Sequence, residues 1–195
     1  MLYKHCLLYF SLVLFILLSA ACSTLPPDNP RNACDIIQDK SSWKKPLKRT
    51  QKTWQTKPSI VLSFMYHESG FRSKAKPARR KLLGFIPWFR PSDAYGYAQA
   101  TKATWQAYKM DANRFFVRRD NFSDSADFIG WYNSVSTKKY GISPQDPYRL
   151  YLAYHEGHTG YGKGYYKKKG WLLETANRVK EKAFIYDRQL KSCGF

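Results

Sequence analysis

The sequence predicts a mostly α-helical domain, and two observations support this fold class. Apolar residues recur at steps of three and four in several segments, which is the spacing of one buried helix face. No run of segments alternates apolar and polar residues as a set of β-strands would. A chain of 195 residues, 44% of them apolar, suits one globular core with an appended segment.

The appended segment is expected at the front, in residues 1–21. Lys4 precedes an apolar run over residues 7–18, and the small residues of Leu18-Ser-Ala-Ala-Cys22 lead directly to a cysteine. The run is shorter than the roughly 20 residues that a membrane-spanning helix needs. This stretch resembles the lipobox of bacterial lipoproteins. The resemblance implies cleavage before Cys22, lipidation of Cys22, and retention at the outer membrane, facing the periplasm.

The remaining chain divides into a tether and a domain. Residues 22–33 are rich in proline and asparagine and are expected to be an extended tether that carries the lipid. Residues 34–195 are expected to form the domain. Cys34 and Cys193 lie near its two ends and predict a disulfide in an oxidising compartment.

The formal net charge of +19 indicates an acidic partner. Nucleic acid is not expected, because an exported lipoprotein meets little of it. Peptidoglycan carboxylates and anionic lipid headgroups are the acidic surfaces within reach. A basic surface without a specific partner is the alternative.

The segment around which we expect the domain to be organised is a helix from Pro58 to Gly70. Proline suits the first helical turn, and glycine suits a left-handed cap. Val61, Phe64 and Met65 fall on one face, and Glu68 continues that face inward. Burial and the negative end of the helix dipole would both favour the protonated carboxyl, which describes a general acid. The alternative is a glutamate paired with a buried lysine or arginine.

The other elements follow from caps and breakers. Residues 72–91 contain three prolines and are expected to be a loop or short elements. Their apolar residues are expected to fold back on the core, and contact with membrane or glycan is the alternative. Residues 157–170 are expected to be a loop with tyrosines free for stacking. Further helices are expected over residues 35–39, over residues 102–108 with Thr101 as N-cap, and over residues 147–156 with Asp146 as N-cap. A helix over residues 125–139 would be capped by Ser123 or Asp124 and would end at Gly141.

The last expected helix covers residues 171–190, and its inward face would carry Leu172, Ala176, Val179, Ala183, Tyr186 and Leu190.

Three short motifs stand in a fixed order: Glu68-Ser-Gly-Phe71, Gly96-Tyr-Ala-Gln99 and Ala153-Tyr-His-Glu-Gly157. Together they resemble the SLT-type lytic transglycosylases, which are lysozyme-like, related to goose-type lysozyme, and cut peptidoglycan. The likeness covers about residues 58–190 and, behind a lipobox, looks like a lipoprotein branch. It implies a lysozyme-like helical domain with a catalytic helix and active-site loops.

The resemblance assigns roles to the first two motifs. Glu68 would be the catalytic acid and base, Ser69 would orient the substrate or the carboxylate, and Phe71 would pack under the site. Gly96 would let the backbone approach the sugar, and Gln99 would offer amide hydrogen bonds to an N-acetyl group or to Glu68. Tyr97-Ala98 departs from the family's Leu-Met and puts the supporting role of Tyr97 in doubt.

In the third motif, the resemblance places the Tyr154 hydroxyl near the catalytic carboxyl. His155 stands where the family has asparagine, so the polar contact of that position is in doubt. Glu156 is either a second carboxylate or a structural ion-pair partner. A zinc site at His155 and His158 is not expected, since their spacing of three is interrupted by Gly157.

The mechanism implied by the resemblance needs one carboxyl group and no cofactor. The acid protonates the oxygen between N-acetylmuramic acid and N-acetylglucosamine, and its carboxylate then activates the muramic 6-hydroxyl to give a 1,6-anhydro end. Two alternatives stay open: a hydrolase in which Glu156 or Asp93 activates water, and a non-catalytic murein-binding lipoprotein. We expect the protein to be monomeric.

The lipobox generates a first prediction. A Cys22→Ala variant, which cannot be lipidated, should move from the membrane fraction to the soluble fraction of the cell envelope. Fractionation of cells expressing each form at equal levels measures this. Retention of the variant as firmly as wild type would contradict the anchor.

Overall fold

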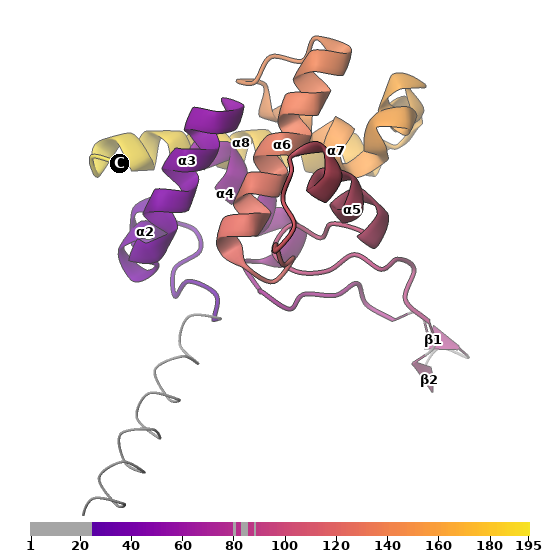
Figure 1. Ribbon diagram of the computed structural model, residues 1–195, viewed down its shortest axis with the longest axis horizontal. Helices are drawn as coiled ribbons and strands as arrows, with labels where there is room; N and C mark the ends of the chain where they lie inside the picture. Colours follow the sequence, from indigo (N-terminus) through magenta and orange to yellow (C-terminus); the bar gives the residue numbers. More distant parts are fainter. Residues whose placement is uncertain (1–24, 80, 83–85, 88) are drawn as a thin grey trace, which may run out of the picture.

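A computed structural model describes residues 25–79, 81–82, 86–87 and 89–195, and it confirms a mostly α-helical fold. The signal segment and Cys22 lie outside the described residues, so the division into signal, tether and domain stays a prediction. Within the described ranges, no helix has the length and apolar content needed to cross a membrane. Figure 1 shows a body of packed helices with one extended arm.

The helix α4 (Pro58–Ser69) lies inside this body, with α8 (Gly170–Ser192) packed along it. Its ends are as predicted, because Pro58 occupies the first turn and Gly70 ends the helix in a left-handed conformation with φ 57°. Val61, Phe64 and Met65 are fully buried. Every residue from Pro58 to Met65 is buried, so this part of α4 is enclosed on all sides.

Three further helices were predicted with small errors at their ends. Thr101 caps α5 (Lys102–Asp111), and Asp146 caps α7 (Pro147–Gly162), as expected. The helix α6 (Phe122–Tyr140) ends at Gly141 as predicted but begins three residues earlier than expected. Its N-cap is Asn121, whose side chain accepts a hydrogen bond from the Asp124 N–H, so the expected caps Ser123 and Asp124 were wrong.

The helix α3 (Lys44–Trp54) was not predicted from the sequence; it follows α2 (Ala33–Asp39) and the short 3-10 helix η2 (Ser41–Trp43). Its basic composition and Pro46 gave no helix signal in the sequence, because proline usually breaks a helix. Pro46 lies in the first turn of α3, however, where proline is tolerated. Trp43 stacks on Phe122 of α6 with ring centroids 3.7 Å apart. This contact joins the start of α3 to α6.

The expected loop over residues 157–170 is largely helical, which corrects that prediction. Gly157 breaks α7 with φ 77° and ψ 153°, but helix resumes after it and is followed by η3 (Tyr165–Lys168). Tyr161 and Tyr166 stack on each other at 4.9 Å. Tyr161 is therefore a packing residue rather than a free ring.

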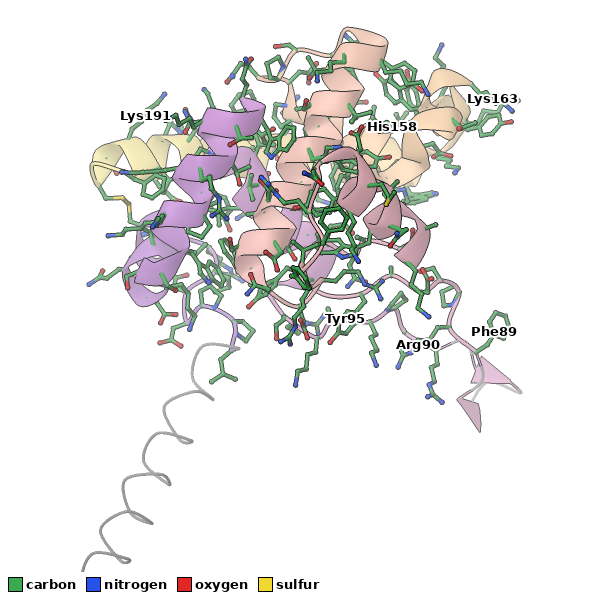
Figure 2. All side chains as sticks on the ribbon, in the orientation of Figure 1. Phe89, Arg90, Tyr95, His158, Lys163 and Lys191 are labelled. Carbon is green, nitrogen blue, oxygen red and sulfur yellow. A yellow bond between two sulfur atoms is a disulfide. The ribbon has the colours of Figure 1, made fainter. Side chains whose placement is uncertain are left out.

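The described residues of the segment 72–91 form an arm that leaves the helical body (Figure 1). It carries a small antiparallel hairpin of β1 (Lys81–Leu82) and β2 (Ile86–Pro87), with Lys81 opposite Pro87. Phe89 and Arg90 lie on this arm away from the helices (Figure 2). The hairpin backbone thus does not fold back on the core as expected.

The six apolar residues expected on the inner face of α8 are all buried, as predicted.

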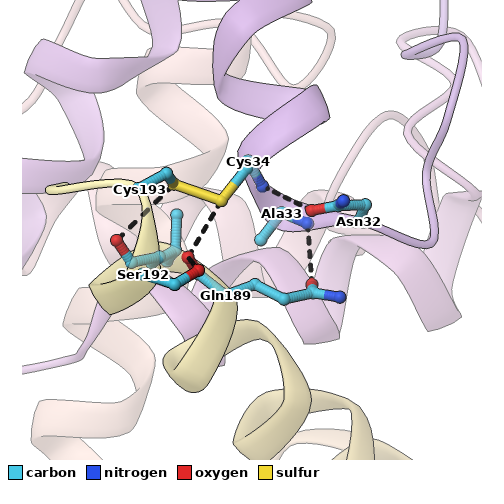
Figure 3. The surroundings of a disulfide bond; sticks show 7 residues. Asn32, Ala33, Cys34, Gln189, Ser192 and Cys193 are labelled. Atoms are coloured by element: carbon cyan, nitrogen blue, oxygen red, sulfur yellow. Dashed lines mark hydrogen bonds between the residues drawn. A yellow bond between two sulfur atoms is a disulfide. The ribbon is translucent and has the colours of Figure 1, made fainter.

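The two ends of the domain are joined as predicted. A disulfide links Cys34 of α2 to Cys193, just after α8 (Figure 3). The Gln189 side chain also accepts a hydrogen bond from the Ala33 N–H at 2.9 Å.

The disulfide generates a second prediction. Because it closes a loop with a sequence separation of 159, a Cys34→Ser/Cys193→Ser variant should lose about 4–5 kcal/mol of unfolding free energy, following the chain-entropy model. Denaturant unfolding of both proteins measures the loss. Reductant should destabilise wild type and leave the double variant unchanged, and equal stability of the two oxidised proteins would contradict the prediction.

Candidate active site

A cavity of about 490 Å³ opens beside the C-terminal end of α4. Its volume lies within the range of roughly 300–1,000 Å³ typical of small-ligand sites. Glu68 from α4, the loop before α5, and side chains of α6 and α7 form its wall. The lining residues are Glu68, Ser92, Ala94, Gln99, Ala100, Thr101, Thr104, Phe128, Tyr132, Tyr154, His155, Glu156 and Gly157.

Glu68 lies in the last turn of α4, and its carboxyl group is largely removed from water. Its Oε1 atom is buried and has no hydrogen-bond partner among the described residues. Burial raises the pKa of Glu68 to about 7, because the charged form loses its hydration, and a hydrogen bond from Tyr151 opposes this only partly. In the described part of the chain, no lysine or arginine forms an ion pair with Glu68. Within the described residues, the alternative of a glutamate paired with a buried lysine or arginine is therefore wrong.

Two tyrosines of α7, one turn apart, surround this carboxyl group. Burial raises the pKa of both Tyr151 and Tyr154, and the negative charge of Glu68 adds to it in each case. Tyr151 is hydrogen-bonded to Glu68, and Tyr154 lines the same cavity. Tyr154 donates its hydroxyl hydrogen to the Ala98 carbonyl at 2.6 Å, which ties α7 to the loop before α5. The sequence analysis missed Tyr151, although it stands three residues before Tyr154 and hence on the same helix face.

The motif Gly96-Tyr-Ala-Gln99 lies in the loop before α5, and its contacts mainly hold that loop in place. A Cβ atom at Gly96 would lie 1.9 Å from the Arg119 carbonyl oxygen, so this glycine permits close approach to protein backbone rather than to a sugar. Tyr97 is buried and packs edge-on against Trp43, outside the cavity lining. Gln99 does line the cavity, but its amide nitrogen donates to the carbonyls of Ala75 and Gly96.

Ser69 and Phe71 belong to the turn after Glu68 and do not line the cavity. The Ser69 hydroxyl donates to the Met65 carbonyl at 3.0 Å and is buried, so it is not directed at a substrate. Phe71 is fully buried, with its ring 5.7 Å from that of Trp43. Both residues fix the turn that carries Glu68.

Glu156 is a second carboxylate of the cavity wall, and it forms an ion pair with Lys169. Both of its oxygens accept hydrogen bonds from Lys169 Nζ, at 2.7 and 2.9 Å. Asp93 is exposed, accepts a hydrogen bond from the Lys102 N–H, and lies outside the cavity lining. Of the two described carboxylates that line the cavity, Glu156 has a cation partner and Glu68 has none.

The family model of the transglycosylase SLT domain matches residues 10–193. The chain belongs to this family. No curated protein and no solved structure matches it. Membership implies cleavage of the glycan strands of peptidoglycan and binding of peptidoglycan as substrate.

Within this SLT domain, the two histidines of α7 have different surroundings. His155 lines the cavity and packs edge-on against Trp171, with ring centroids 5.1 Å apart. His158 stacks on Tyr132 at 4.2 Å, and its Nε2 atom is hydrogen-bonded to the Ser136 hydroxyl. The described residues contain no group of three or more potential metal ligands.

Proposed function

We propose that this SLT domain cleaves the bond between N-acetylmuramic acid and N-acetylglucosamine without water, with Glu68 as general acid and then general base. The observation that carries the proposal is the state of Glu68. It is a buried carboxyl group in the wall of the cavity, with a pKa of about 7 and no cation partner among the described residues. Such a group holds a proton near neutral pH and can also release it, as one residue serving both steps must do.

The proposed steps balance in atoms and protons. The Glu68 carboxylic acid donates its proton to the glycosidic oxygen as the bond from that oxygen to C1 breaks. The positive charge developing at C1 can be met by the substrate's own N-acetyl oxygen, which removes the need for a second protein carboxylate. Glu68, now a carboxylate, takes the proton of the muramic 6-hydroxyl, and O6 bonds to C1. The enzyme regains its proton, and the 1,6-anhydro product contains no added water.

The hydrolytic alternative requires a base that activates water. Glu156 is the candidate in the cavity wall, but its two hydrogen bonds from Lys169 occupy both oxygens. A carboxylate held through both oxygens by a lysine ammonium is oriented toward that cation rather than toward a substrate water. This contact favours the anhydro-forming reaction over hydrolysis.

We further propose that the protein acts as a monomer on peptidoglycan while lipid on Cys22 holds it at the outer membrane, facing the periplasm. The support is the lipobox-like sequence and the net charge of +19, which suits a carboxylate-rich polymer. The tether from Cys22 would let the domain reach the glycan strands.

This proposal generates a third prediction. Peptidoglycan incubated with the disulfide-bonded protein should release fragments ending in 1,6-anhydro-muramic acid, and Glu68→Gln should lower the rate by about 100- to 10,000-fold, because it removes the transferable proton. Mass spectrometry of the products makes the measurement. An unchanged circular dichroism spectrum would show that the variant remains folded.

The Glu156→Gln variant discriminates between the two reactions. The lytic reaction predicts that it still forms anhydro ends, at a rate reduced by the loss of its ion pair with Lys169. Products one water heavier, lost in Glu156→Gln, would instead establish a hydrolase. Binding of peptidoglycan without any cleavage would establish the non-catalytic alternative.

A further inference from the structure

Trp171 is a large apolar side chain that the fold leaves exposed beside the cavity. It is 55% exposed at the start of α8, whereas the next residue, Leu172, is fully buried and holds the helix in the core. Single exposed apolar side chains are common and need no explanation by themselves. The position of Trp171 relative to the cavity is what sets it apart.

Two separate contacts hold Trp171 next to the cavity wall. Its ring packs against that of His155, which lines the cavity, with centroids 5.1 Å apart and planes at 78°. The second contact runs through Lys169, the N-cap of α8, whose Nζ binds both oxygens of the cavity residue Glu156. This ion pair fixes the start of α8, and therefore Trp171, against the kinked part of α7.

We propose that Trp171 is a sugar-binding platform that extends the cavity, on which a peptidoglycan sugar beyond the pair cleaved at Glu68 stacks. This rests on the proposed function. A pyranose ring has an apolar face of C–H groups, and the indole ring offers a large, electron-rich surface of matching character. Tryptophan also loses little conformational freedom on binding, which makes it an efficient anchor. A glycan strand is a polymer, so it presents further sugars beyond the cleaved bond.

Phe184 provides a matched control within the same helix. It is also 55% exposed on α8, but it lines a separate hollow with Lys57 and Asp187, and not the cavity of Glu68. If exposed aromatic rings of α8 bound glycan merely by being apolar, the two positions would behave alike. The proposal requires that only Trp171 matters.

The test measures binding separately from cleavage. The protein from residue 22 onward, with Cys22→Ser to prevent lipidation, keeps all the described residues, and Glu68→Gln prevents turnover. The ligand is purified peptidoglycan glycan strands freed of stem peptides, titrated by isothermal calorimetry. Adding Trp171→Ala should raise the dissociation constant about 10-fold or more, as expected for a tryptophan anchor. Trp171→Phe, which restores an aromatic ring, should recover part of the loss, and Phe184→Ala should change it less than about twofold.

Several outcomes would overturn the proposal. Unchanged affinity in Trp171→Ala, or an equal loss in Phe184→Ala, would show that Trp171 is not a glycan contact and would leave the proposed reaction intact. A loss in Trp171→Ala that is accompanied by a lower melting temperature and is not recovered by phenylalanine would assign it to folding. Failure of the Glu68→Gln parent to bind the strands at all would overturn both the platform and the proposed function.

Discussion

The burial of one unpaired carboxyl group at the end of α4 is the constraint on which the site depends. Raising the pKa of Glu68 from 4.5 to about 7 corresponds to roughly 3 kcal/mol less favourable ionisation in the folded protein. The sign follows from proton linkage: the folded state holds this proton more tightly than the unfolded chain, so the contribution costs stability as the pH rises from 4.5 to 7. The rest of the core must offset this cost at neutral pH.

The surroundings of Glu68 explain how the group stays buried without a cation. The loop before α5 is held against the 118–121 segment at Gly96, by the Tyr97 N–H bond to the Arg119 carbonyl, and against α7 by Tyr154. Lys169 forms an ion pair with Glu156 at the cavity wall. Charge is thus balanced at the cavity edge. Burial raises the pKa of Glu68, and the hydrogen bond from Tyr151 opposes this only partly.

Sequence reasoning predicted the elements whose ends carry strong signals. Pro58 and Gly70 bound α4, and the step of three and four identified the buried face of α8, because caps and periodicity act locally. It missed α3 because Pro46 reads as a breaker, although a first-turn proline costs the helix no hydrogen bond. It also took the glycines after Gly157 for a loop, where tertiary packing of Tyr161 on Tyr140 of α6 supports helix instead.

At the site, sequence reasoning predicted that the Glu68 carboxyl group is buried and that its pKa is raised, but it misjudged the neighbouring residues. Gly96, Tyr97 and Ser69 act within the protein, since their contacts depend on segments far apart in sequence, such as Arg119 and Trp43. The engagement of Glu156 by Lys169 is likewise a tertiary contact across the α7 kink. Pairings of this kind cannot be deduced from local spacing.

The protonation of Glu68 itself tests the central claim most directly. Infrared difference spectra between wild type and Glu68→Gln isolate the carbonyl stretch of the protonated Glu68 carboxyl group, and a pH titration follows its loss. Burial without a cation predicts a midpoint near the pKa of about 7. A midpoint near 4.5, the value of an unperturbed glutamate, would show a carboxylate already ionised at neutral pH and would contradict its assignment as the general acid.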